Sequence, residues 1–92
     1  MTTTAKTTAA DTILALDLGK YKSVACVWRA ADDSRFTSVP TSRASLRRLI
    51  VQHQPDVVLI ETCLLAGWVC DLCAHLRVRC LEKEKGSGVV FA

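Results

Sequence analysis

The sequence predicts a small α/β domain with a mixed five-stranded sheet and the element order β-β-β-α-β-α-β. Two observations predict this fold class. The first half of the chain holds three short apolar segments separated by turn residues, which is typical of an antiparallel meander. The second half alternates two stretches of helical period with two short apolar runs, which indicates right-handed crossovers to parallel strands.

The three strands of the meander are predicted at Thr12–Leu18, Tyr21–Arg29 and Arg35–Val39. Gly19 and Lys20 fill the gap between the first two strands, as in a tight hairpin turn. Residues 32–34, Asp-Asp-Ser, indicate a second turn. Pro40 ends the third strand, because proline cannot donate a hydrogen bond to a neighbouring strand.

Two amphipathic helices follow, one from a cap at Thr41 or Ser42 to Gln54 and one over residues 65–76. Their apolar positions at helical spacing are Leu46, Leu49, Ile50 and His53, and then Leu65, Trp68, Val69, Leu72, Cys73 and Leu76. The two remaining strands are predicted at Val57–Glu61 and Val78–Leu81, and residues 89–92 are too short to add an element. His53 and Trp68 are therefore expected to be packed rather than catalytic or base-stacking.

Length and composition limit the possible classes of protein. The 92 residues suffice for one small domain, and half of them are hydrophobic, which favours a packed core over disorder. No apolar run reaches the roughly 20 residues that span a bilayer, and the start of the chain does not resemble a secretory signal. We expect a cytoplasmic protein with no membrane partner and with reduced cysteines. Residues 1–12 are expected to form a flexible tail, 13–81 the domain and 82–92 a divergent C-terminal tail.

Asp17 and Glu61 each place a carboxylate at the end of an apolar strand. If these strands are neighbours, both carboxylates project from the same sheet edge, where their mutual repulsion favours a bound cation. Mg²⁺ suits such a site because it takes oxygen ligands from one or two carboxylates and from substrate phosphates. Two such ions can hold the attacking and leaving oxygens of a phosphodiester exchange. The alternative is structural, with Asp17 capping the turn at Gly19 and Glu61 capping the following helix or pairing with an arginine.

Two segments of the chain resemble motifs of the DEDD-type insertion-sequence transposases, now described as bridge-RNA-guided DNA recombinases. The first comprises Ile13–Lys20 (ILALDLGK) with Val24–Val27 (VACV), and the second, more specific one is Val57–Leu72 (VVLIETCLLAGWVCDL). The resemblance covers about residues 13–80. It implies an RNase H-like (RuvC-like) fold in which Asp17 and Glu61 are the first two of four catalytic, Mg²⁺-binding acids. It also implies DNA and a guide RNA as partners, and homo-oligomers in the full-length family.

After Cys80 the sequence departs from the family pattern. In the family, the last two acids lie on a later helix, and a C-terminal domain carries a serine nucleophile. Neither follows Cys80 here. The resemblance therefore predicts an incomplete, truncated domain that supplies two ligands, binds Mg²⁺ weakly or not at all, and is inactive alone.

Four basic residues are candidates for contacts with nucleic acid, namely Lys20, Lys22, Arg43 and Arg47. The net charge of +3 is compatible with such a partner, although many ordinary domains are equally basic. The two lysines are the stronger candidates for phosphate contacts, because they follow Asp17 closely. For the two arginines, with the neighbouring Arg48, a solvated helix face is the favoured interpretation.

A zinc site is not expected, although the chain holds several possible ligands at Cys63, Cys70, Cys73, His75 and Cys80. The Cys70-x-x-Cys73 pair lies inside a predicted amphipathic helix, whereas structural zinc sites usually present such a pair on a tight turn. Cys73 also falls on the apolar stripe of that helix, which favours a small core residue.

Two other functions remain open at this point. The hairpin around Asp17 and Gly19 also resembles the first phosphate motif of actin-like ATPases and sugar kinases, which need a later Gly-rich loop. Alternatively, the chain is a non-enzymatic domain that binds nucleic acid or protein, with structural roles for Asp17 and Glu61. Because no later helices follow to cover the second face of the sheet, we also expect exposed apolar surface and poor solubility.

Overall fold

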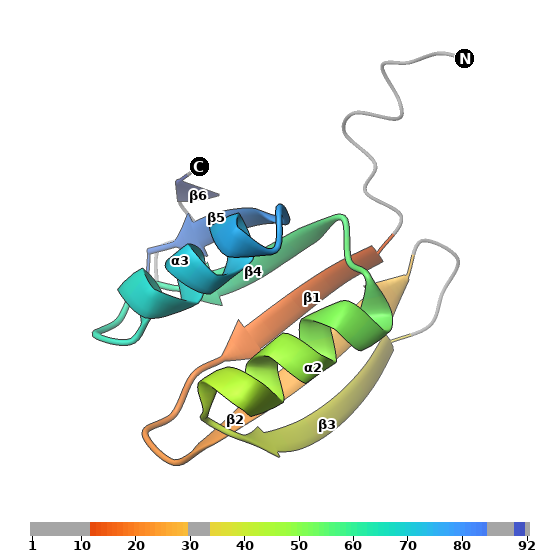
Figure 1. The fold of residues 1–92 in the computed structure, drawn as a ribbon, viewed down its shortest axis with the longest axis horizontal. Helices are drawn as coiled ribbons and strands as arrows, with labels where there is room; N and C mark the ends of the chain where they lie inside the picture. Colours follow the sequence, from red (N-terminus) through yellow and green to blue (C-terminus); the bar gives the residue numbers. More distant parts are fainter. Residues whose placement is uncertain (1–11, 30–33, 85–89, 92) are drawn as a thin grey trace.

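The computed structural model describes residues 12–29, 34–84 and 90–91. The N-terminal tail expected at 1–12 lies outside these residues apart from Thr12, as do most of the turn expected at 32–34 and the Gly-rich residues 85–89. The elements are β1 Thr12–Asp17, β2 Lys22–Arg29, β3 Ser34–Pro40, α2 Arg43–His53, β4 Val57–Glu61, α3 Ala66–His75, β5 Arg79–Lys83 and β6 Val90–Phe91 (Figure 1).

The strands form one mixed sheet in the order β3-β2-β1-β4-β5-β6. Strand β1 is antiparallel to β2 and parallel to β4, and β5 is in turn parallel to β4. The predicted α/β class and mixed sheet are confirmed. The five predicted strands are all present. The prediction that residues 89–92 add no element is wrong, because Val90 and Phe91 pair with Lys83 and Glu82 of β5 as a short sixth strand.

Two predicted boundaries also differ from the structure. The connection between β1 and β2 is not a two-residue turn but runs over the four residues from Leu18 to Tyr21. Gly19 lies so close to the backbone carbonyl of Lys22 that a Cβ atom there would overlap it. The last predicted strand, 78–81, is found at 79–83, because β5 pairs with β4 up to the position where Lys83 lies opposite Glu61.

Helix α2 begins where the sequence predicts, because Ser42 is a side-chain cap. Its hydroxyl oxygen accepts a hydrogen bond from the backbone N–H of Ser45 at 3.1 Å. The helix ends at His53, and the following residue, Gln54, caps it in the left-handed conformation with φ 45°. Helix α3 has no side-chain cap, because Leu65 stands at its N-cap position.

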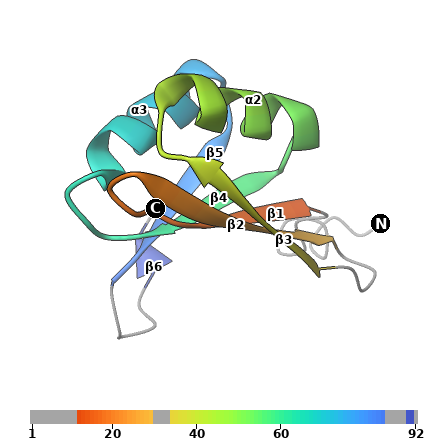
Figure 2. The same cartoon turned by 90° about the horizontal axis from the view of Figure 1, so that it is seen from below.

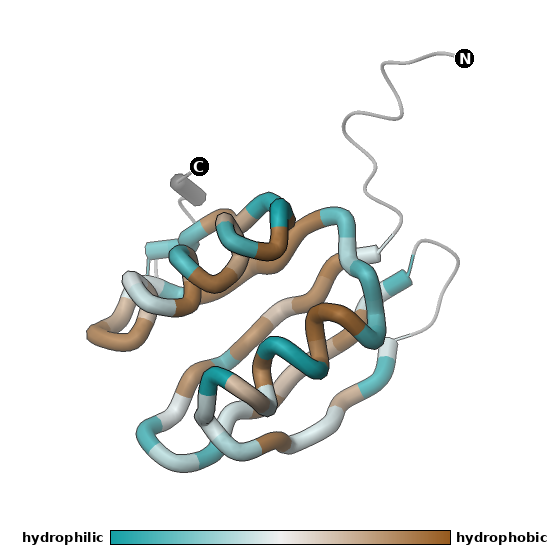
Figure 3. Tube along the Cα trace, in the orientation of Figure 1, coloured by the Kyte–Doolittle hydropathy of each residue, from teal (hydrophilic) through white to brown (hydrophobic). Residues whose placement is uncertain are grey.

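Both helices pack on the same face of the sheet, which we call the helix face (Figure 2). Inward positions alternate along the strands, so every second residue of β1, β2 and β4 meets a helix. The core comprises Leu14, Leu16, Ala25, Val27, Leu46, Leu49, Ile50, Val58, Ile60, Ala66, Val69, Leu72 and Cys73. Figure 3 shows hydrophobic residues along the central strands. The predicted packing of Trp68 against this core is confirmed.

In the part of the chain that the structure describes, no helix covers the opposite face, which we call the open face (Figure 2). Its residues form three rows across the strands in the order β3, β2, β1, β4, β5. The edge row is Ser38, Val24, Asp17, Glu61 and Lys83. The middle row is Phe36, Cys26, Ala15, Leu59 and Leu81, and the far row is Ser34, Trp28, Ile13, Val57 and Arg79.

The open face exposes large hydrophobic side chains, as the sequence predicts. Phe36 is 73% exposed, and Val24 and Trp28 are each 42% exposed. The poor solubility expected from this surface stays a prediction. In the described parts of the chain, no helix has the length and apolar character needed to cross a membrane.

Candidate functional site

The carboxyl ends of the parallel strands meet at one edge of the sheet, which we call the carboxyl edge. Strands β1, β3, β4 and β5 all run toward this edge, and β2 starts there. Helices α2 and α3 also begin there, since each follows a strand that ends at this edge. In sheets of this type, ligands bind outside the carboxyl ends of the strands.

Asp17 and Glu61 come together at this edge, on two adjacent parallel strands. Leu16 pairs with Ile60, so the two acids are the next residues along β1 and β4. Leu16 and Ile60 point to the helix face and are buried, so both acids project from the open face. They line one cavity of about 330 Å³, together with Ala15, Leu16, Val24, Cys26 and Phe36. Asp17 is exposed and Glu61 half-buried.

The structural alternative for the two acids predicts partners that the described residues do not provide. Within the described ranges, neither Asp17 nor Glu61 makes a hydrogen bond or an ion pair. Asp56 provides the contrast, because its carboxylate accepts a hydrogen bond from the backbone N–H of Thr12 at 2.9 Å. The two acids of the edge row are therefore available to a ligand.

The chemistry of the pair suits a hard cation that keeps open coordination positions. Two carboxylates supply oxygen ligands, and Mg²⁺ usually completes its octahedral shell with water and substrate phosphate. Among the residues that the structure describes, no group of three or more His, Cys, Asp or Glu side chains could hold a metal ion. Asp17 and Glu61 alone would thus form a weak site, open on the side of the solvent.

The basic candidates divide between two regions. Lys20 and Lys22 lie at the carboxyl edge, where the Lys20 ammonium sits 5.3 Å from the centre of the Tyr21 ring. Lys22 is on the open side of β2, because the next residue, Ser23, is buried on the helix face. Arg43 opens α2 at the same edge.

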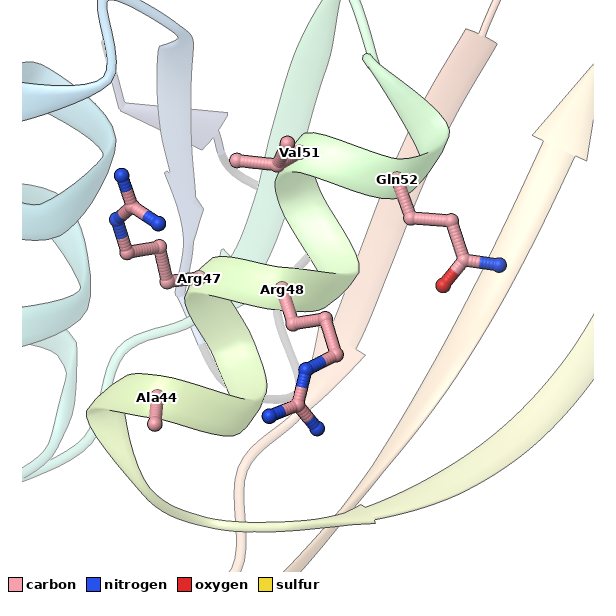
Figure 4. A pocket seen from close by; sticks show the side chains of 5 residues that line it. All are labelled: Ala44, Arg47, Arg48, Val51 and Gln52. Atoms are coloured by element: carbon pink, nitrogen blue, oxygen red, sulfur yellow. The ribbon is translucent and has the colours of Figure 1, made fainter.

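Arg47 lies in the helix layer, across the sheet from the two acids. It lines a shallow cavity of about 540 Å³ on the outer surface of α2, with Ala44, Arg48, Val51 and Gln52. In Figure 4, Arg47 extends toward the α3 side of the helix, whereas Arg48 extends to the other side. One ligand held by Asp17 and Glu61 would not reach this surface directly, so the structure does not bring Arg47 into the site.

Three residues of the site carry no signal in the sequence. Lys83 stands opposite Glu61 in the edge row, yet it falls after the predicted end of the last strand. Phe36 and Val24 line the cavity, because β2 and β3 place them on the open face beside β1. Only the register of the sheet reveals these neighbours.

Three of the five cysteines gather between α3 and β5. The Cys70 and Cys80 sulfurs are 3.4 Å apart, and the Cys70 thiol donates a hydrogen bond to a Glu82 carboxylate oxygen at 3.6 Å. Burial, then the hydrogen bond with Cys80, raises the pKa of Cys70 to about 12. The hydrogen bond between Cys73 and Cys80 is the main cause of two further shifts: it raises the pKa of Cys80 and lowers the pKa of Cys73. Cys73 is fully buried, as predicted for a core residue, whereas Cys63 is exposed.

Raising the pH above about 9 is expected to destabilise the fold through Cys70. The unfolded thiol ionises near its ordinary pKa of 9.0, whereas the folded thiol keeps its proton up to about 12. The thiol's contribution is fully present below the lower value and is lost as pH rises toward the higher one, because only the unfolded state releases its proton. Urea unfolding followed by circular dichroism across this interval measures the loss. Cys70→Ala should lose less stability, and an equal loss would contradict the prediction.

Comparison with known proteins gives no family for this chain. No protein-family model matches it, and no curated protein matches it significantly. A proposal about function must therefore rest on the geometry of Asp17 and Glu61 on the open face.

Proposed function

We propose that this chain is the N-terminal part of an RNase H-like (RuvC-like) domain of a DEDD-type transposase or recombinase. Asp17 and Glu61 would be two of its Mg²⁺ ligands. The observation that carries the proposal is the placement of both acids at the carboxyl edge, on adjacent parallel strands and in one cavity. The element order β-β-β-α-β-α-β, which the periodicity of the sequence predicts and which the structure contains before the additional β6, also supports it.

Each residue of the site has a defined role in this proposal. Asp17 and Glu61 hold the cation, whose positive charge offsets the repulsion between the two carboxylates. The bound Mg²⁺ would supply charge stabilisation at a phosphodiester, as in other phosphoryl-transfer sites. Lys83 stands opposite Glu61, and Lys22 is two residues before Val24, the partner of Asp17, so both lysines would contact the flanking phosphates of DNA. The two remaining acids and the serine domain of the family would come from other parts of a complete enzyme, so we propose that this chain is inactive alone.

One observation favours a second candidate, a non-enzymatic interaction domain. The open face exposes Phe36, Trp28 and Val24 in a single patch, and such patches mark surfaces that bind partners. The actin-like or kinase-like interpretation has less support. The close approach of Gly19 to the Lys22 carbonyl gives that glycine a structural reason without a phosphate.

Binding of Mn²⁺ tests the proposed metal site, because this paramagnetic ion substitutes for Mg²⁺ and loses its electron paramagnetic resonance signal when bound. We expect weak binding to the wild-type chain. Asp17→Asn and Glu61→Gln should each weaken it about tenfold or more, because one unit charge near a divalent ion contributes about 2 kcal/mol even in water. Excess Mg²⁺ should displace the Mn²⁺.

The matched control is Asp71→Asn, which removes an exposed carboxylate from α3, in the helix layer. Its Mn²⁺ affinity should equal that of the wild type. If the double variant Asp17→Asn/Glu61→Gln binds Mn²⁺ as well as the wild type, the two acids are structural and the interaction domain becomes the better assignment.

A further inference from the structure

We propose that the open face binds single-stranded nucleic acid, with Phe36 and Trp28 stacking on unpaired bases beside the carboxylates of the edge row. The inference deepens the proposed function, because it names the substrate class that would lie against Asp17 and Glu61. It rests on that function only for the chemistry, since the stacking surface can bind a strand without any metal ion.

The two aromatic side chains are placed for a common ligand. Phe36 pairs with Cys26 across β3 and β2, and Trp28 is two residues further along β2 on the same face. Such diagonal neighbours lie about 7–8 Å apart, so a short stretch of strand can reach both rings. Phe36 is 73% exposed and Trp28 42% exposed, which leaves ring surface free for stacking.

The residues around the rings leave room for flat ligands. On the β2–β3 side, Ser34, Cys26 and Ser38 are the cross-strand and same-strand neighbours of the two aromatics on the open face, and on β1 the larger Ile13 lies opposite Trp28. The serine and cysteine side chains are small, so they do not rise above the Phe36 ring or above the β3 side of the Trp28 ring. The cavity that contains Asp17 and Glu61 has Phe36 in its lining and a volume of about 330 Å³, within the range of small-molecule pockets.

The charges on this face favour nucleic acid over an apolar protein segment. Lys22 lies at the carboxyl edge on β2, the strand that carries Trp28. Lys83 and Arg79 lie on the open face of β5, three strands away from β2, so these three cations stand on this face with the two carboxylates of Asp17 and Glu61. In the adjoining loop, Lys20 and the 78% exposed Tyr21 add a further cation next to an exposed aromatic ring. Basic groups interleaved with exposed aromatic rings are typical of surfaces that bind single strands, whose phosphates and bases they contact separately.

A single strand fits this surface better than a duplex. Bases within a duplex are stacked on each other, so a side chain can insert between them only by unstacking them, which costs free energy that unpaired bases do not require. Unpaired bases can splay onto Phe36 and Trp28, with the phosphates directed toward Lys22 and Lys83. This arrangement would bring a phosphodiester next to the two acids.

The test is a fluorescence anisotropy titration of a labelled thymidine oligonucleotide with the full chain, at low salt and in EDTA. We expect the wild type to bind the single strand more tightly than the same sequence as a duplex. Phe36→Ala should weaken single-strand binding by roughly five- to hundredfold, the loss caused by removing one stacking platform. Phe36→Trp should retain the binding. Val51→Ala is the control, because Val51 is 50% exposed on α2, in the helix layer.

Several outcomes would overturn the inference. They are the absence of single-strand binding, equal binding by Phe36→Ala, and equal affinity for the duplex. Sedimentation of a wild-type dimer that Phe36→Ala dissociates, without oligonucleotide binding, would assign the face to a second copy instead. Because EDTA removes the cation, this result is separable from the Mn²⁺ titration, and either proposal can fail while the other holds.

Discussion

Replacing Leu14 by alanine is expected to lower the free energy of unfolding by about 2–5 kcal/mol, the usual loss for a buried leucine that leaves a cavity. Leu14 is fully buried in β1, and β1 is paired on both sides, so the neighbouring backbone has little freedom to close the gap. A domain of this size has a total stability of about 5–14 kcal/mol. The variant should therefore lose a large part of its folded population on mild heating.

Urea unfolding followed by circular dichroism measures this effect, and Leu64→Ala is the matched control. Leu64 is fully exposed in the loop before α3, so its truncation should change the stability by less than about 0.5 kcal/mol. The same midpoint for Leu14→Ala and Leu64→Ala would show that the predicted core is wrong.

Gly19→Ala is expected to destabilise the fold by about 1–3 kcal/mol, as forced backbone shifts usually do. The added Cβ would overlap the Lys22 carbonyl oxygen, and backbone atoms cannot move aside as a flexible side chain can. The loop between β1 and β2 would have to rearrange, and Asp17 stands immediately before it. If the proposed metal site is correct, Mn²⁺ binding should weaken as well.

Gly67→Ala provides the matched glycine control. Gly67 lies in the first turn of α3, and a Cβ there would meet no atom within 4 Å. Alanine has the higher helix propensity, so this variant should gain about 0.5–1 kcal/mol. Thermal unfolding of the two variants should shift in opposite directions, and a destabilised Gly67→Ala would contradict the open space found around that residue.

Local patterns predicted most of the secondary structure. The apolar stripe of α2 and the cap at Ser42 depend on residues within a few positions of each other, so the sequence alone reveals them. The pairing of Asp17 with Glu61 could also be foreseen, because both acids end apolar strands and parallel neighbours end at one edge. The stripe and the cap need no knowledge of the sheet order, whereas the meeting of the two acids also requires β1 and β4 to be neighbours.

Features set by distant strands could not be foreseen. Strand β5 continues to Lys83 because β4 supplies a partner, whereas the local composition around Glu82 and Lys83 suggests a charged tail. Phe36 reaches the carboxylate cavity only through the register of β3 on β2, which a one-residue slip would reverse. Strand β6 is too short for any periodic pattern and exists only as a partner of β5.

The position of β1 between β2 and β4 also affects how the chain matures during synthesis. The hydrogen bond between Thr12 and Asp56 joins residues 44 positions apart, so β1 gains its second neighbour long after its first. At about 5–20 residues per second, a ribosome needs roughly 2–9 s for that interval. Until α2 and α3 have emerged, the nascent chain leaves Leu14 and Leu16 without the helices that later cover them. Newly made chains are therefore expected to depend on chaperones that shield this surface until β4 and α3 have emerged.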